Sequence, residues 1–202
     1  MINVAVLASG RGSNFSAIIK AVKRGTLKIN LPLLVCDNPK AGVIARAKRA
    51  GVKTALIESK EYPTVKEFES RIVEYLEKEK IDLVVLAGFM RILGKDIIAH
   101  YKHRIINIHP ALLPSFKGAH GIKDAFDYGV KVTGVTVHFV DELMDHGAII
   151  LQQPVKIEEG DTPESLEDKI HKVEHKIYPL AIGLFAEGKL KIQGRKVKVA
   201  TR

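Results

Sequence analysis

Short apolar runs alternate with stretches of helical spacing along the first half of this chain. The apolar runs predict buried strands at residues 2–8, 31–36, 54–57, 81–87 and 105–109. Between them, apolar side chains recur every three or four residues, as Phe15, Ile18 and Val22 do, which predicts helices over residues 14–24, 41–50, 64–80 and 93–101. Such alternation is typical of an α/β fold: a mostly parallel central sheet with helices on both faces and a Rossmann-like N-terminal half.

The pattern changes after residue 109. Residues 110–121 are rich in Pro and Gly and form a segment too long for a passive connector, so we expect a functional loop there. Strands are predicted over residues 132–140 and 148–157, and a helix opens at Thr162-Pro163, with Pro at the first helical position. Pro179 is expected to kink that helix. A β-hairpin is predicted over residues 189–199, and we expect the whole sheet to be mixed.

Composition is that of an ordinary globular protein. The chain has 202 residues, 46% hydrophobic and 27% charged, which fits a single domain over residues 1–202. No apolar run approaches the roughly 18 residues that a membrane helix needs. The N-terminal sequence lacks a basic leader, and the single cysteine, Cys36, lies in an apolar strand pattern, so we expect a cytoplasmic protein that does not bind membranes.

The net charge of +9 is concentrated at the C-terminus, in a stretch of six basic residues and no acidic ones: Lys189, Lys191, Arg195, Lys196, Lys198 and Arg202. No aromatic side chains are interleaved there for base stacking. We therefore expect a general attraction for small anions and no nucleic-acid partner.

Candidate site residues follow strand ends. In open α/β sheets, ligands bind beyond the carboxyl ends of the strands, so the loops after Ala8, Ala87 and His109 are expected to converge on one crevice. In the first loop, Gly12 lets the backbone approach an anion, while Ser13, Asn14 and the following helix N-terminus offer donors. A monophosphate site is one interpretation; a tight turn with Ser13 or Asn14 as a simple N-cap is the other.

Three polar side chains at strand ends suggest acyl-transfer chemistry. Asn107 and His109 are two apart on a predicted strand and so share a face, and Asp145 lies in a later turn. An amide can bind a developing oxyanion, an imidazole can pass a proton, and a carboxylate can orient the imidazole. After the strand ending at Ala87, Arg91 could pair with a carboxylate, and its apolar neighbours could line a slot for a flat ring.

The histidines do not predict a metal site. His171 and His175 are four apart on the last helix, but no third ligand is near in the sequence and there is no HExxH motif. We therefore expect them to be solvated, and no metal to be needed.

Several segments resemble the phosphoribosylglycinamide formyltransferases, a family that uses 10-formyltetrahydrofolate in purine synthesis: VAVLASGRGSN, DLVVLAGFMRIL, INIHPALLPSFKG and KVTGVTVHFVDELMDHGAIILQ. The similarity spans about residues 2–185. It implies the formyltransferase fold, with a phosphate-binding half at about 1–100, a catalytic and folate-binding half at about 101–188, and the basic hairpin at 189–202. Three residues depart from the usual family pattern. Lys117 stands where Pro is common, His146 where Thr or Gly is common, and Ala148 where Pro is common.

The resemblance also implies roles for residues. The catalytic residues would be Asn107, His109 and Asp145. The residues expected to bind the phosphoribosylglycinamide are Gly12, Ser13, Asn14 and Glu174. Those expected to bind the folate are Met90, Arg91, Ile92, Leu93, Asn107, Asp141, Glu142, Leu143, Met144 and Asp145. The implied reaction is direct formyl transfer to the glycinamide amine through a tetrahedral intermediate, in a monomer or homodimer. Two alternatives remain at this point: a related enzyme with another acceptor, such as an amino-sugar, and a binding module without activity.

Overall fold

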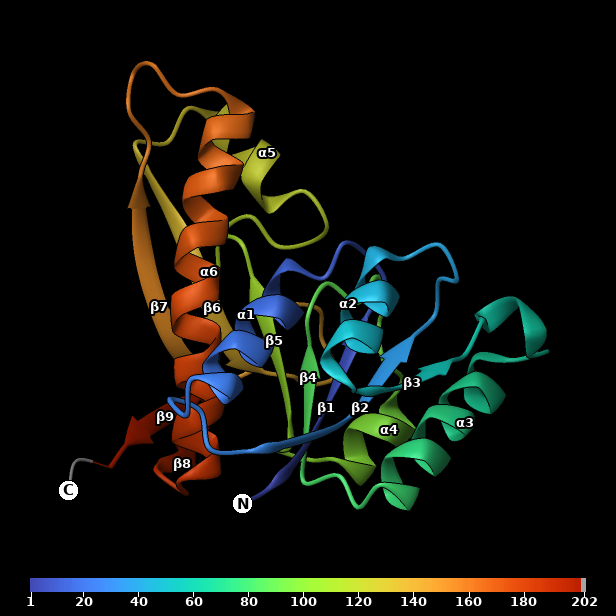
Figure 1. The fold of residues 1–202 in the computed structure, drawn as a ribbon. Coiled ribbons are helices and arrows are strands. Elements are labelled where there is room, and N and C mark those ends of the chain that lie inside the picture. The colour runs from blue at the N-terminus through green and yellow to red at the C-terminus, as the bar shows by residue number, and fades with distance from the viewer. Residues whose placement is uncertain (201–202) are drawn as a thin grey trace. The chain divides into compact units, whose positions relative to one another are not determined.

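The computed structural model describes residues 1–200; Thr201 and Arg202, the end of the predicted basic tail, lie outside that range. The chain divides into two compact units, here called unit 1 (Met1–Ile106) and unit 2 (from Asn107 onward). Each unit combines strands with helices (Figure 1).

Unit 1 is built on parallel strands. β1 (Asn3–Ala8), β2 (Asn30–Cys36), β3 (Lys53–Leu56) and β4 (Leu83–Leu86) lie in the order β3-β2-β1-β4, and each neighbouring pair is parallel. The residues of β1 from Val4 to Ala8 are fully buried, as the continuous apolar run predicts. This order and parallel pairing confirm the Rossmann-like N-terminal half.

The helices of unit 1 begin and end close to the predicted positions. They are α1 (Ser13–Lys23), α2 (Gly42–Ala50), α3 (Val65–Lys78) and α4 (Lys95–His100), with a short 3₁₀ turn, η1 (Ser59–Glu61). The side chain of Thr64 caps α3 by accepting from the N–H of Glu67, and α2 ends at Gly51 with φ +73°, a left-handed conformation that suits glycine. α1 lies beside α2, and α3 beside α4.

The boundary between unit 1 and unit 2 falls within the strand β5 (Ile105–His109), so that Asn107 and His109 belong to unit 2. Within unit 2, β6 (Val132–Phe139) and β7 (Ile149–Lys156) pair antiparallel. The hairpin β8 (Leu190–Gln193) and β9 (Lys196–Val199) follows in the order β6-β7-β9-β8. The predicted α/β class, with mostly parallel but mixed pairing, is therefore confirmed.

Two helices complete unit 2; the first was not predicted, and the kink expected at Pro179 in the second stays a prediction. α5 (Gly121–Tyr128) was not predicted, although its buried Ala125 and terminal Gly129, at φ +81°, are ordinary helix signals. α6 (Pro163–Ala186) continues past Pro179, because buried residues on both sides of the proline pack this helix along β6 and β7 (Figure 1). Within residues 1–200, no helix is both long enough and apolar enough to cross a membrane.

Candidate active site

The end of β5 presents His109 to the Asp145 carboxylate within unit 2. The imidazole is 3% exposed, and its Nε2–H donates to the carbonyl oxygen of Phe116 at 2.7 Å. Its Nδ1 faces Asp145 Oδ2 at 3.5 Å. Because a carbonyl oxygen can only accept, Nε2 carries a proton, and a second proton on Nδ1 would point at the carboxylate. The ring is therefore placed to take up and release a proton at Nδ1.

The Asp145 carboxylate is held from the facing loop. Its Oδ2 accepts from the backbone N–H of Gly118 at 2.8 Å, and only 10% of the side chain is exposed. The backbone of Asp145 has φ +48°, in the left-handed region that Asp and Asn tolerate better than other non-glycine residues. The loop after β6 and the loop after β5 thus meet at this carboxylate.

A second histidine, His138 on β6, completes the cluster and was missed by the sequence analysis. Its Nδ1–H donates to the carbonyl oxygen of Phe139 at 2.8 Å, and its Nε2 lies 3.3 Å from Asn107 Nδ2 and 3.8 Å from Asp145 Oδ1. Burial lowers the pKa of His138, although the hydrogen bond to Phe139 and the Asp145 charge oppose the shift. The neutral ring accepts from Asn107 and so orients that amide.

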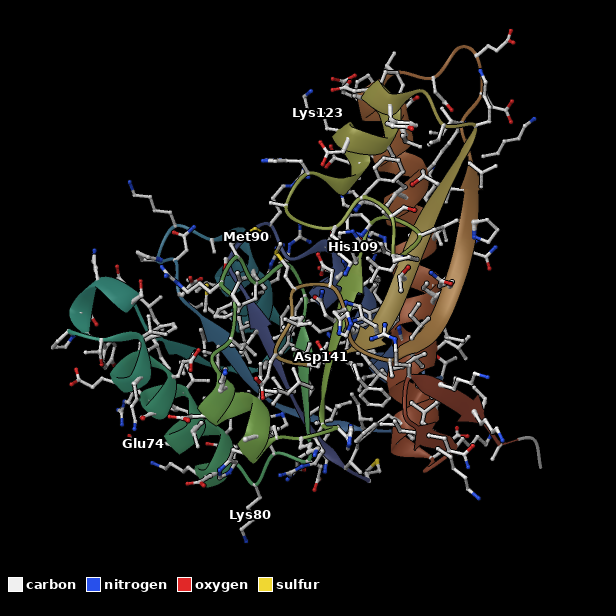
Figure 2. The ribbon with its side chains drawn as sticks, turned by 180° about the vertical axis from the view of Figure 1, so that it is seen from behind. Glu74, Lys80, Met90, His109, Lys123 and Asp141 are labelled. Atoms are coloured by element: carbon white, nitrogen blue, oxygen red, sulfur yellow. The ribbon has the colours of Figure 1, made fainter. Side chains whose placement is uncertain are left out.

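The Pro- and Gly-rich segment after β5 is fixed in place by buried hydrogen bonds. Thr136 Oγ1 donates to the carbonyl oxygen of Ala111 at 2.7 Å and accepts from the N–H of Leu113 at 3.0 Å. Gln152 Nε2 donates to the carbonyl oxygen of Leu113 at 2.9 Å. This segment is therefore an ordered part of the site, and it places the Phe116 carbonyl oxygen against His109. Figure 2 labels His109, the last residue of β5.

In unit 1, Gly12 shapes the turn predicted to bind a phosphate. Gly12 is the N-cap of α1 with φ +77°, and a Cβ there would lie 2.6 Å from Val43 Cγ2. Ser13 and Asn14 are already in the first helical turn, so their interpretation as a simple N-cap is wrong. The turn leaves the N-terminus of an 11-residue helix without a side-chain cap, as an anion site requires.

The loops after β1 and β4 meet, as predicted for these two strand ends. The N–H of Ser9 donates to the carbonyl oxygen of Gly88 at 2.9 Å, and Ser9 Oγ accepts from the N–H of Met90 at 3.0 Å. The loop after His109 belongs to unit 2, and its place in a common crevice stays a prediction.

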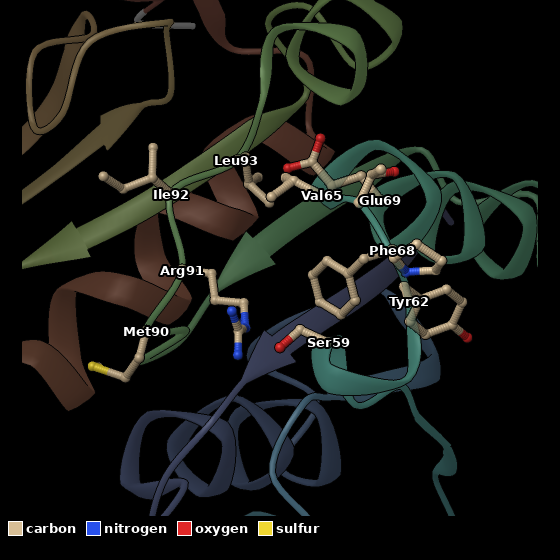
Figure 3. Close-up of a pocket in the computed structure, with 11 residues that line it drawn as sticks. Ser59, Tyr62, Val65, Phe68, Glu69, Met90, Arg91, Ile92 and Leu93 are labelled. Carbon is tan, nitrogen blue, oxygen red and sulfur yellow. The ribbon is translucent and has the colours of Figure 1, made fainter.

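Residues 90–93 border a hollow of about 510 Å³ in unit 1 (Figure 3). Arg91 pairs with the protein's own Asp37, Nε to Oδ2 at 2.7 Å, and its guanidinium lies 5.4 Å from the centre of the Phe68 ring. Met90 and Ile92 are about 70% exposed, whereas Leu93 is buried. Exposed apolar side chains beside a hollow suit an apolar ligand, and their folate-binding role stays a prediction.

The remaining predicted ligand contacts lie in unit 2. Leu143 and Met144 are mostly exposed and Glu142 is exposed, while Asp141 accepts from the N–H of Leu143 at 3.1 Å. Glu174, on α6, is 4% exposed, and its Oε2 lies 2.8 Å from Nδ1 of His171.

Comparison with known proteins decides the family: the family described as formyl transferase matches residues 2–182. This chain belongs to the formyl transferase family. The phosphoribosylglycinamide formyltransferase of Bacillus subtilis (strain 168) is 47% identical over 178 residues, which cover 88% of this chain and 91% of that protein. The human trifunctional purine biosynthetic protein adenosine-3 is 42% identical over 94% of this chain, which spans 19% of that longer protein.

Solved structures agree with this assignment. Glycinamide ribonucleotide transformylase 1 from Symbiobacterium toebii superposes with a TM-score of 0.97 at 42% identity, over 100% of this chain and 95% of that one. Phosphoribosylglycinamide formyltransferase from Bacillus halodurans has a TM-score of 0.88 at 46% identity, over 90% and 93% of the two chains. The protein is thus a formyltransferase enzyme, and the interpretation as an inactive binding module is set aside.

The loop that carries Asp145 in this formyltransferase depends on Gly147. A Cβ at position 147 would lie 1.8 Å from the carbonyl oxygen of Phe139 and 2.7 Å from its carbonyl carbon. These are backbone atoms, so the loop would have to move. We expect Gly147→Ala to lower kcat at least tenfold and to cost roughly 1–3 kcal/mol of stability, the usual cost of overpacking.

Steady-state kinetics and urea unfolding would measure both effects. Gly160→Ala is the matched control, because a Cβ at Gly160 would have no neighbour within 4 Å. Equal behaviour of the two variants would contradict the packing role of Gly147.

His171 is not a solvated helix residue as predicted. It is half-buried, with Nδ1 at 2.8 Å from Glu174 Oε2 and Nε2 at 3.1 Å from Glu167 Oε1. The His175 ring stacks on it with the ring planes 8° apart. The hydrogen bond to Glu174 raises the pKa of His171, against the opposing effect of burial. In the described part of the chain, no group of three or more His, Cys, Asp or Glu residues could hold a metal ion.

This raised pKa predicts a pH-dependent contribution to stability. A histidine whose pKa is higher in the folded state stabilises the fold fully below its unfolded value, near 6.5, and loses that effect as pH rises through the folded value. We therefore expect the stability difference between wild type and His171→Gln to be largest at acidic pH and to shrink above neutrality. Urea unfolding at several pH values measures it, with the exposed Lys172→Gln as control; a difference that does not change with pH would contradict it.

Proposed function

We propose that this formyltransferase transfers the formyl group of 10-formyltetrahydrofolate to the amine of N1-(5-phospho-D-ribosyl)glycinamide, in de novo purine (IMP) biosynthesis. The products are the N-formyl compound and tetrahydrofolate. The observation that supports the chemistry is the close pair of His109 and Asp145, with Asn107 on the same face of β5 as His109. The names of the similar proteins support the choice of acceptor.

In the proposed mechanism, the substrate amine attacks the formyl carbon directly and forms a tetrahedral intermediate. The Asn107 amide and a protonated His109 stabilise its oxyanion, by on the order of 3 kcal/mol for each donor. Asp145 orients His109 and helps move the proton from the attacking nitrogen to the folate nitrogen that leaves. The amide nitrogen of Asn107 donates to the neutral His138. This hydrogen bond keeps the nitrogen, which is a donor, turned toward the cluster that contains His138.

The two units would divide the binding of substrates. In unit 1, Gly12, Ser13 and Asn14 bind the phosphate, and residues 90–93 contact the folate. In unit 2, Glu174 binds the glycinamide portion, and Asn107 with residues 141–145 contacts the folate. In this proposal the enzyme acts on small-molecule substrates only and needs no metal. It works in the cytoplasm, as a monomer or a homodimer.

One assay tests the function. The protein is mixed with glycinamide ribonucleotide and 10-formyltetrahydrofolate, tetrahydrofolate release is followed, and the formylated amide is identified by mass spectrometry. Inorganic phosphate should compete with the ribonucleotide, whereas an enzyme acting on an amino-sugar without phosphate would show no such competition. Absence of the formylated product would overturn the proposal.

A further inference from the structure

The hairpin β8–β9 directs one arginine at the loop that carries Asp145. Arg195 lies in the turn of this hairpin, and its Nη2 donates to the backbone carbonyl oxygen of His146 at 2.7 Å. Its Nη1 lies 2.8 Å from Nε2 of the same histidine. All of these groups belong to unit 2. His146 directly follows Asp145, so Arg195 holds the peptide next to the predicted catalytic carboxylate.

Arg195 and Asp141 both hold the side chain of His146. The His146 Nδ1 lies 2.7 Å from Asp141 Oδ2, and a carboxylate oxygen accepts, so Nδ1 carries the proton. Nη1 of Arg195 lies 2.8 Å from Nε2 and 3.2 Å from Nδ1, and distances this similar place the guanidinium over the face of the imidazole ring. Arg195 therefore contacts residue 146 twice, through the ring face and through the hydrogen bond from Nη2 to the carbonyl oxygen. Asp141 fixes the same ring from its edge.

We propose that the C-terminal hairpin is a strap that fixes the loop of residues 141–146 from outside, with Arg195 as a positioning residue for Asp145. The expected effect on catalysis rests on the proposed function, whereas the expected ordering of the loop does not rest on it.

The loop needs restraint from more than one side. Asp145 adopts a left-handed backbone at φ +48°, a conformation that is less favourable for a non-glycine residue than for glycine. The Gly118 N–H holds its side chain, and Arg195 holds the carbonyl oxygen of the next residue, His146. The arginine is itself anchored, because its neighbour Lys196 pairs with Ile149 on β7, just beyond the loop.

Hydrogen–deuterium exchange on the full-length protein tests the strap directly. In Arg195→Ala and in His146→Ala, peptides covering residues 140–147 should exchange several-fold faster than in wild type, and the double variant should exchange no faster than the singles. Lys198→Ala is the matched control, since it removes an exposed positive charge from the same hairpin. Exchange in Arg195→Ala equal to wild type, or an equal acceleration in Lys198→Ala, would overturn the proposal.

Kinetics provide the second measurement. Arg195→Ala should raise KM for 10-formyltetrahydrofolate and lower kcat, each by about two- to threefold. The resulting four- to ninefold loss of kcat/KM corresponds to about 1 kcal/mol, the value of an exposed charge-assisted contact. KM for the ribonucleotide should not change, a separation that general destabilisation would not produce. Arg195→Lys should restore part of the effect, because one ammonium cannot reproduce both contacts. If wild type transfers no formyl group, the proposed function fails, while the exchange result still decides the strap.

Discussion

Replacing Asp145 by Asn should lower kcat by about 10²–10⁴-fold, the usual contribution of a positioned proton-transfer group. Asn tolerates the left-handed backbone at this position, and its Oδ1 can still accept from the Gly118 N–H. The loop should therefore keep its conformation. What is lost is the negative charge 3.5 Å from Nδ1 of His109.

Steady-state kinetics with both substrates would measure this effect. KM for 10-formyltetrahydrofolate should change by no more than a few-fold, because the shape of the loop is retained. Asp127→Asn is the matched control: this carboxylate is exposed on α5 and pairs with Lys123, away from the cluster. An undiminished kcat in Asp145→Asn would show that the proton takes another path.

Replacing His109 by Gln should have an effect of similar size. The glutamine Nε2 can still donate to the Phe116 carbonyl oxygen, so the loop after β5 keeps an important contact. An amide cannot take up a proton or carry a charge near neutral pH, so both the proton transfer and the charge beside the oxyanion are lost. We expect kcat to fall about 10³-fold.

The double variant of His109 and Asp145 distinguishes a shared role from two separate ones. If the two groups act as a unit, the double variant should be little slower than the slower single variant, as for other coupled catalytic groups. His100→Gln, a partly exposed histidine on α4 of unit 1, is the control and should retain activity. Fully multiplicative losses would contradict the coupling.

The sequence predicts most of the fold because strand and helix periods are local properties. Continuous apolar runs mark β1, β2 and β4, and helical spacing marks α1 to α3. Most of the strand residues are buried, and each helix buries one apolar face. The short α5 was missed because a helix of eight residues repeats its apolar positions only about twice. The course of α6 past Pro179 depends on packing against β6 and β7, which local propensity does not contain.

The site could be predicted where spacing alone determines geometry. Asn107 and His109 share a face because side chains on a strand alternate. The proximity of Asp145, 36 residues after His109, was expected from the chemistry that the three polar residues could share and from the family resemblance, and the structure places it beside His109. His138 could have been suspected as a polar residue among the apolar positions of β6, but its partner on β5 depends on strand pairing.

By itself, then, the order of residues determined the alternation of strands and helices, the glycine-dependent turn at Gly12 and the polar pair on β5. Only the tertiary structure decided which polar groups are in contact: the neutral His138 with Asn107, His171 with Glu174, and Arg195 with His146. The reason is physical. Backbone periods act over a few residues, whereas burial, protonation and hydrogen-bond partners depend on which distant segments the sheet and its helices bring into contact.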